Sequence, residues 1–447
     1  MKDEARNFYK TMIFIAIPVA LQCMLNSSFS IIDQIMIGQL GSTAISAVGL
    51  AGKFFGIFNV IIGAISGIAG IMISQYIGKN NSRQINKSFY VNLLISVFIA
   101  LVFTVLCIFF PKQIIKLYIA DELCIEIASV YLRIISVSFV PVALISIIST
   151  MIRCMEKASL PLYATIVASV LNTALNYALI FGKFGFAELG VTGAGIATVS
   201  SQIANALLLV VFILKFSKKN NLSIKPNFSM TKTEWKNYFA MLIPLFVCEF
   251  LWVLGENVYA VIYGHLGTLS CAGMTLTYPI QGLLIGSLSG LSQGAGIIIG
   301  KSQGMKEEEK SYADAKRTLF FGLEVSVLFS LLLILMNRFY INLYKIEDDT
   351  KNIGSLLLIA FAIYQPVKVL NMILGNGIIR SGGKTKINMI VDIIGTWGFG
   401  VPLGLLSAFV FNLPIHFVYS ILSFEEVIRL VIMLVVFKKR IWINQIQ

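Results

Sequence analysis

The sequence predicts an all-α polytopic membrane protein with twelve transmembrane helices, arranged as two parallel six-helix repeats in two lobes around a central cavity. Three observations predict this fold class. The 447-residue chain is 57% hydrophobic and 13% charged, with a mean hydropathy of +0.84, whereas an average soluble domain contains about 25% charged residues. Twelve apolar runs are long enough to cross a bilayer as helices. The two halves of the chain also resemble each other.

The twelve apolar runs follow one another along the chain with short polar connections. We expect helices at about 11–37, 44–77, 88–110, 124–150, 160–182, 188–214, 237–262, 270–300, 318–337, 352–378, 387–410 and 413–437. Of the Lys and Arg residues outside these runs, 25 lie in the termini and alternate connections on one side and six on the other. Because cytoplasmic segments carry the excess of Lys and Arg, we expect an integral plasma (inner) membrane protein with both termini in the cytoplasm.

The middle of the chain separates two repeats. Its longest polar connection, residues 216–235, is the predicted cytoplasmic linker between an N-terminal lobe (1–215) and a C-terminal lobe (236–447). A shift of 226 residues places seven residues on identical ones: Pro18 on Pro244, Gly38 on Gly264, Leu40 on Leu266, Gly41 on Gly267, Gly56 on Gly282, Gly70 on Gly296 and Gly78 on Gly304. Six spans in each half give both halves the same orientation, which is typical of transporters that bind their substrate between two lobes.

The first span contains polar residues that are unusual for a membrane helix. Pro18 is expected to bend it, because proline removes a backbone donor. Gln22, Asn26 and Asp33 stand at i, i+4 and i+11 and share one face. An unpaired carboxylate at mid-bilayer costs roughly 2.5–3.5 kcal/mol. We therefore interpret Asp33 as a cation-coupling carboxylate and place Gln22 and Asn26 in the substrate cavity; a structural buried acid satisfied by polar neighbours is the alternative.

The seventh span carries acids and aromatic residues on one face. Glu249 and Glu256 stand at i and i+7, with Trp252 and Tyr259 on the same side. One interpretation is a cavity wall, in which acids attract a cation and aromatic rings stack on it. The alternatives are an internal ion pair between Glu256 and a lysine, and ordinary packing for the two aromatic residues.

Further charged residues are expected to be structural. Five of them fall within or near predicted spans, where a buried charge needs a partner, so we expect internal ion pairs: Lys53, Arg133, Lys368, Asp392 and Arg429. The alternative for Lys53 and Lys368 is that they substitute for a bound cation in one conformational state. Arg153 and Arg380 occupy equivalent repeat positions at predicted cytoplasmic helix ends. We expect them to anchor loops to lipid headgroups or helix C-termini.

The sequence contains no motif for enzymatic chemistry. It has no P-loop, zinc-protease motif, nucleophile elbow or catalytic His/Asp set, so we expect no enzyme, no cofactor and no metal site. The net charge of +13 is distributed over alternate loops rather than one stripe, which argues against a nucleic-acid partner. Without an ATP-binding motif, transport would draw on an ion gradient, worth roughly 2.3 kcal/mol per charge per 100 mV.

Four segments, in order, resemble motifs of the multidrug and toxic compound extrusion (MATE) family. IIDQIMIGQLGSTAISAVGLAG resembles the first-helix signature, and LNTALNYALIFGKFGFAELGVTGAGIATVSSQ resembles the fifth and sixth helices. CEFLWVLGENVYAVIYGHLG looks like the seventh helix, and IIRSGGKTKINMIVD like the link from the tenth to the eleventh. The resemblance covers essentially the whole chain. It implies a twelve-helix, two-lobed antiporter that exports organic, often cationic, compounds in exchange for protons or sodium ions.

The resemblance also implies the cation-coupling residues. Asp33 matches the first-helix acid, and Asn172 matches a fifth-helix asparagine of the same lobe. Where many prokaryotic members have a second aspartate four residues later, this chain has Asn176, whose carbonyl can ligate sodium but which cannot take up a proton. Glu249 resembles the acid of a C-L-E motif in plant-type members. In the tenth span, where some members carry an acid, this chain has Lys368.

We therefore expect a cation-coupled (H+ or Na+) antiporter that exports organic, mainly cationic, drug-like compounds by rocker-type alternating access. The only partners expected are a small-molecule substrate and the bilayer, with a monomer as the working unit. The first alternative is a lipid-linked precursor flippase of the same superfamily, whose cavity is usually more cationic. A membrane-embedded enzyme or receptor is the second alternative, disfavoured by the internal repeat and the missing catalytic groups.

Overall fold

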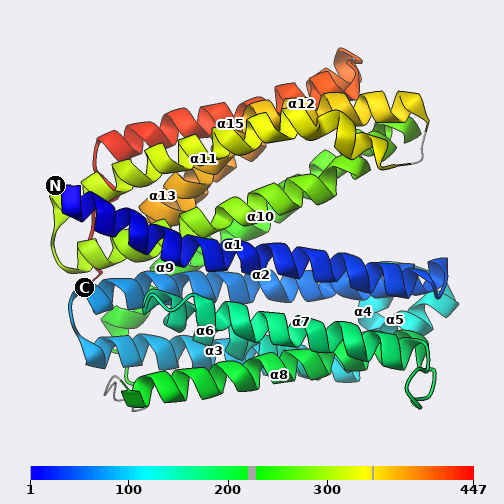
Figure 1. The fold of residues 1–447 in the computed structure, drawn as a ribbon, viewed down its shortest axis with the longest axis horizontal. Helices are drawn as coiled ribbons and strands as arrows, with labels where there is room; N and C mark the ends of the chain where they lie inside the picture. The colour runs from blue at the N-terminus through cyan, green and yellow to red at the C-terminus, as the bar shows by residue number, and fades with distance from the viewer. Residues whose placement is uncertain (1, 220–227, 345–346, 447) are drawn as a thin grey trace. The chain divides into compact units, whose positions relative to one another are not determined.

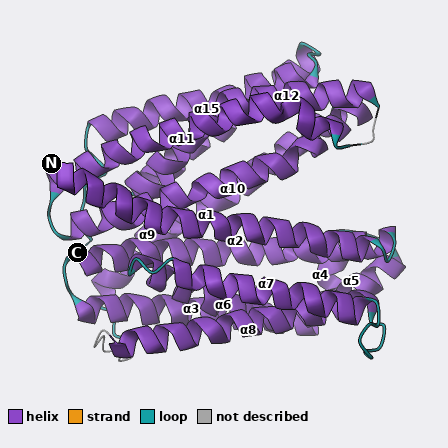
Figure 2. Ribbon diagram, in the orientation of Figure 1, coloured by secondary structure: helices purple, strands orange, loops and turns teal. Residues whose placement is uncertain are grey.

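The computed structural model describes residues 2–219, 228–344 and 347–446 (Figure 1). Throughout this part of the chain the regular structure is helical and no strand occurs (Figure 2). Each predicted span coincides with one helix or with a run of consecutive helical segments, so the predicted all-α fold class is confirmed. Part of the predicted linker, residues 220–227, lies outside the described residues.

The first six spans lie in the N-terminal half. Their helices are α1 (Lys2–Gly38), α2 (Ser42–Gly78), α3 (Ser82–Phe109), α5 (Glu122–Ile135), α6 (Phe139–Cys154), α7 (Ser159–Ile180) and α8 (Gly190–Lys219). The helices α5 and α6 form one span, because only the short 3-10 segment η1 (Ser136–Ser138) separates them. The single short helix α4 (Pro111–Lys116) precedes them.

The last six spans lie in the C-terminal half and include three π-helical segments. Their helices are α9 (Lys232–His265), α10 (Thr268–Gly304), α11 (Glu308–Asn342), α12 (Asp348–Met372), α13 (Thr385–Asp392), α14 (Val401–Leu405) and α15 (Ile415–Lys438). The π-helical segments are η2 (Ile373–Ile379), η3 (Ile393–Gly400) and η4 (Leu406–Val410). Widened helical turns of this kind often mark functional sites.

Among the described residues, eleven continuous helical stretches, some of them made of consecutive helical segments, are long and apolar enough to cross a membrane. The remaining long helix, α15, has 24 residues but carries Glu425, Glu426 and Arg429 near its centre. A helix with three ionisable side chains can cross a bilayer when neighbouring helices satisfy them.

The helices form two compact units. Unit 1 comprises Met1–Ala20 and Thr231–Gln447, and unit 2 comprises Leu21–Met230. The first twenty residues, which the sequence grouped with the N-terminal lobe, thus pack with the C-terminal helices. Pro18 lies inside α1, two residues before the border between the units. The bend expected there stays a prediction.

In unit 2, α7 packs along α8, and α2 packs against α3, α5 and α6 (Figure 1). The core at the α2–α6 crossing contains the stacked rings of Phe58 and Phe139, with centroids 4.5 Å apart. A Cβ atom at Gly193 would lie 2.7 Å from the backbone of Leu179. Only glycine therefore allows the beginning of α8 to approach the end of α7 this closely.

In unit 1, the beginning of α1 and the end of the chain share one apolar cluster. Phe8 and Met12 belong to this cluster together with Phe437 and Trp442. The Trp442 side chain is fully buried and its ring stacks on Phe437, with centroids 5.8 Å apart. The segment after α15 is therefore part of the folded core rather than a loose end.

Candidate functional site

The first candidate site lies in unit 2, where α1 meets α7. The side-chain amide of Asn176 donates a hydrogen bond of 2.6 Å to Asp33 Oδ1 and a second of 3.2 Å to Asn172 Oδ1. Asn172 and Asn176 stand four residues apart on α7, so their amides share one helix face, and both side chains are buried. The structure thus brings together three of the four residues predicted to couple cations.

This arrangement can accept a small cation. One carboxylate and nearby amide carbonyls are oxygen ligands of the kind that hard cations prefer, and a carboxylate can alternatively take up a proton. In the structure the Asp33 carboxylate is engaged by an amide N–H, which is a neutral donor. Because that donor carries no charge, the negative charge of Asp33 is not compensated by this contact.

The other polar residues of the first span have different surroundings. Gln22 is buried, donates to Thr165 Oγ1 at 2.8 Å and accepts from Arg153 Nη2 at 2.8 Å. Its side chain therefore joins α1 to α6 and α7, whereas Asn26 is exposed. The predicted role of both residues in a substrate cavity stays a prediction.

The second candidate site is a pocket of about 500 Å³ inside unit 1, lined by residues of α9, α10, α12, η2, α13 and α15. Pockets of about 300–1,000 Å³ hold drug-sized ligands. Three residues expected on a cavity wall line it, namely Glu249, Trp252 and Glu256. Tyr259 does not: its side chain is 5% exposed and lies behind the wall.

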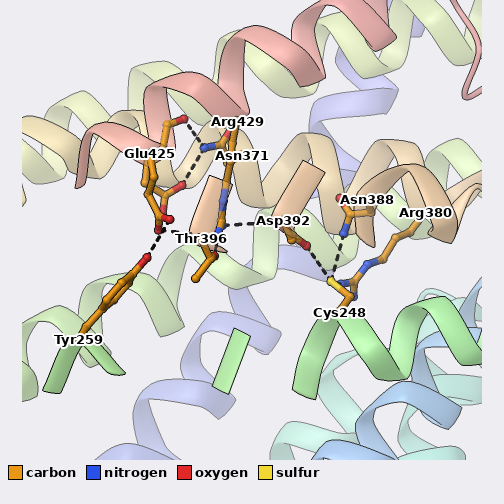
Figure 3. A network of polar contacts seen from close by, with 10 residues as sticks. Cys248, Tyr259, Asn371, Arg380, Asn388, Asp392, Thr396, Glu425 and Arg429 are labelled. Carbon is orange, nitrogen blue, oxygen red and sulfur yellow. Dashed lines mark hydrogen bonds and ion pairs between the residues drawn. The ribbon is translucent and has the colours of Figure 1, made fainter. Parts of the chain in front are cut away.

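One end of this pocket contains an ion pair joined to a buried thiol. Arg380 Nη1 lies 2.9 Å from Glu249 Oε1. Cys248 donates a hydrogen bond of 2.7 Å to Asp392 Oδ2 and accepts one of 3.5 Å from Arg380 Nη2 (Figure 3). The side chain of Arg380 is 13% exposed. The expected anchoring of Arg380 to headgroups or helix ends is therefore wrong, because its partner is the Glu249 carboxylate.

The adjoining part of the network is centred on Arg429 of α15. Its guanidinium lies 3.5 Å from Asp392 Oδ1 and 3.7 Å from Glu425 Oε1, and it donates to Thr396 Oγ1. The hydroxyl of Tyr259 donates a 2.8 Å hydrogen bond to Glu425 Oε2 (Figure 3). The expected internal ion pair is confirmed for Arg429 and Asp392. These contacts also engage Glu425 and Arg429, two of the three ionisable residues that make α15 an unusual span.

Three expected ion pairs do not form. Lys53 and Arg133 are exposed and have no carboxylate within 4 Å among the described residues. Lys368 also lacks a carboxylate at that distance, which excludes its pairing with Glu256 in this structure. Its ammonium instead lies over the rings of Tyr419 and Phe361, at 5.7 and 5.9 Å from their centroids, within the range of a cation–π contact.

Three further polar residues of this region, Glu425, Glu426 and Asn371, were not predicted from the sequence. Asn371 Nδ2 donates a 2.7 Å hydrogen bond to Glu426 Oε2, and both residues line the pocket. One signal was available, because Glu425 and Arg429 stand at i and i+4, the spacing of an intrahelical ion pair. Nothing in the sequence indicated the contact between Asn371 and Glu426, since 55 residues separate them.

Membrane-length helices, an internal repeat and a drug-sized polar pocket within them define a polytopic membrane transporter. A family model, MatE, matches residues 18–178 and again residues 244–406. The two matched segments begin 226 residues apart, which confirms the shift found from the glycines and prolines. The chain belongs to the MATE family, and it is therefore an integral membrane transporter of small molecules and not an enzyme.

Relatives align over nearly the whole chain. "Uncharacterized transporter YisQ" of Bacillus subtilis (strain 168) is 23% identical, and the alignment covers 96% of this chain and 94% of the relative. "Probable multidrug resistance protein NorM" of Thermotoga maritima is 25% identical over 92% of this chain and 88% of its own.

Solved structures have the same fold. A MATE crystal structure in the bent conformation superimposes with a TM-score of 0.87 at 16% identity, covering 97% of this chain and 95% of that one. A Pyrococcus furiosus transporter of the MOP superfamily, described by the phrase "Reverse polarity of binding pocket suggests different function", superimposes with a TM-score of 0.86 at 16% identity and the same coverage. These likenesses confirm the twelve-helix, two-lobed fold.

Proposed function

We propose that the protein is a cation-coupled antiporter that exports organic, mainly cationic, drug-like compounds. The observation that carries the proposal is the unit 1 pocket, where Glu256 and Glu426, two carboxylates with no Lys or Arg nitrogen within 4 Å among the described residues, lie with the aromatic rings of Trp252 and Tyr278. Carboxylates attract a cation, and aromatic faces bind it by cation–π contacts. The name of the NorM relative, a probable multidrug resistance protein, agrees with this class of substrate.

Asp33, Asn172 and Asn176 are the proposed coupling site. A proton or a sodium ion at Asp33 would neutralise a charge that is otherwise costly to bury. Binding of that cation would favour one conformation of an alternating-access cycle. The exported compound would be released from the other conformation. Glu249, the fourth predicted coupling residue, already has Arg380 as a counter-ion. A transported cation would therefore have to compete with Arg380 at Glu249.

The proposal also includes the oligomeric state, the membrane orientation and the lobe boundaries. The protein would act as a monomer in the plasma membrane with both termini in the cytoplasm, as the distribution of Lys and Arg indicates. The lobes would be residues 1–215 and 236–447, joined by the linker 216–235. The proton or sodium ion would be a transported species rather than a resident cofactor.

The test is export of a fluorescent organic cation in proteoliposomes, with a proton gradient or a sodium gradient imposed separately. We expect one gradient to drive export by the wild-type protein, and Asp33→Asn to reduce that export to the level of empty liposomes. Asp349→Asn, an exposed acid in the first turn of α12, is the matched control. Wild-type export by Asp33→Asn at equal reconstitution would refute the assignment of Asp33.

The second candidate function is a flippase for a lipid-linked precursor. It is favoured by three basic residues on the pocket wall, Lys368, Arg380 and Arg429, and by the description of the Pyrococcus furiosus neighbour. Two of these bases are paired with acids, which leaves Lys368 for a phosphate. Binding of a polyprenyl pyrophosphate that organic cations do not displace would favour this function.

A further inference from the structure

The charges around the unit 1 pocket are unequally compensated. Four acids and three bases line it. Arg380 pairs with Glu249 at 2.9 Å, and Arg429 pairs with Asp392 at 3.5 Å. Glu425, whose side chain lies inside the wall, shares Arg429 and accepts the Tyr259 hydroxyl. Both of its oxygens are therefore engaged by the protein, away from any ligand.

Three charged side chains remain without an ion pair at the pocket surface. Glu256 makes no hydrogen bond or ion pair with any described residue, and its side chain is exposed. Glu426 accepts a hydrogen bond from Asn371, which is a neutral partner. Lys368 is the single base without a carboxylate within 4 Å among the described lining residues. The accessible surface of the pocket thus presents two negative groups and one positive group.

The Lys368 ammonium is held in place by aromatic rings. Tyr419 and Phe361 lie 5.7 and 5.9 Å from it, and both rings are almost completely buried, at 3% and 1% exposure. A rigid, buried ring pair keeps the ammonium at the wall, because moving it away would break both cation–π contacts. A ligand that enters the pocket therefore meets a fixed positive charge beside the two acids.

We infer that Lys368 is a specificity-determining residue that limits the positive charge of the compounds this pocket accepts. One positive group on the ligand balances the three accessible charges, which are the two acids and Lys368. A second positive group would face the ammonium without an acid of its own, and charge interactions are strong in a site partly closed to water. The pocket consequently selects monocations over dications. This inference rests on the proposed export of organic cations.

Equilibrium binding to purified protein without any ion gradient tests the inference. The probes are ethidium and propidium, which share one fluorescent ring system and carry one and two positive charges. We expect the wild-type protein to bind ethidium more tightly, and Lys368→Gln to raise the affinity for propidium relative to ethidium by roughly tenfold or more. Lys368→Arg keeps the charge and should keep the preference. Lys351→Gln, on the same helix and paired with Asp348 at the surface, is the matched control.

Two outcomes would overturn the inference. One is an equal change, or no change, in the affinity for both probes in Lys368→Gln. The other concerns a second variant, Glu256→Gln, which should weaken binding of propidium more than binding of ethidium. An unchanged ratio of the two affinities in Glu256→Gln contradicts the inference, even where Lys368→Gln fails to fold. Absence of gradient-driven export together with a shifted binding ratio would refute the proposed function and leave the charge selection standing.

Discussion

Arg380 and Glu249 form an ion pair with an N–O distance of 2.9 Å, joining the end of η2 to α9 across the wall of the unit 1 pocket. The two residues are 131 positions apart in the sequence. Glu249 is the seventh-span acid predicted to couple cations, so its charge is already compensated by an internal cation in this structure. A free cation can bind Glu249 only when Arg380 moves away or exchanges partners.

The first prediction concerns this ion pair. Arg380→Gln leaves the Glu249 carboxylate without its counter-ion and the Cys248 thiol without its charged donor, and breaking one side of a buried pair costs about 3–5 kcal/mol. We expect a lower unfolding temperature in detergent, partly restored in the double variant with Glu249→Gln. Lys386→Gln, an exposed base six residues later, should have no effect. Equal unfolding temperatures for Arg380→Gln and wild type would contradict the prediction.

The second prediction concerns a glycine in η3. A Cβ atom at Gly400 would collide with the Tyr259 hydroxyl and with Glu425 Oε2, so Gly400→Ala should break their hydrogen bond. Overpacking of this kind costs about 1–3 kcal/mol. Gly398→Ala, in the same segment, meets open space and should be neutral. Chemical denaturation of the two variants side by side measures the difference, and equal stability would exclude a tight fit at Gly400.

The third prediction concerns the choice of coupling ion. Asn176→Asp would place a second carboxylate within hydrogen-bonding distance of Asp33, where the amide now stands at 2.6 Å. Two carboxylates this close share a proton, because both cannot be ionised together. We expect export driven by a proton gradient to rise relative to export driven by a sodium gradient. Export from proteoliposomes, with each gradient imposed separately, measures the ratio of proton-driven to sodium-driven export. An unchanged ratio in Asn176→Asp would contradict the prediction.

The fourth prediction concerns the end of the chain. Trp442 is fully buried, its indole N–H donates to Phe437 O at 3.2 Å, and Asn444 Nδ2 donates to Gly382 O at 3.1 Å. Trp442→Ala should therefore destabilise unit 1 by about 3–5 kcal/mol. Ile441→Ala, whose side chain is 48% exposed, is the neighbouring control. Unfolding temperatures that fall equally for both would mean that the segment does not support the core.

The candidate sites could be predicted from the sequence only in part. Asp33, Asn172 and Asn176 meet in the structure, because a membrane carboxylate and the matching fifth-helix amides are recognisable in a family motif. Tyr259 was expected on the cavity wall from its place on one face of α9, but it lies behind the wall against Glu425. Helical periodicity identifies a face and cannot say whether a neighbouring helix covers it.

The sequence by itself determined the class of protein, the number, order and approximate bounds of its spans, and the repeat. These follow from hydropathy and local composition, since the bilayer sets the length of each apolar run. Only the tertiary structure decided which charged groups meet. Arg380 pairs with Glu249, Cys248 with Asp392, and Lys368 with two aromatic rings. The first two pairs join residues more than a hundred positions apart, and Tyr419 lies on another helix than Lys368. Helix packing alone selects among the many charges that could pair.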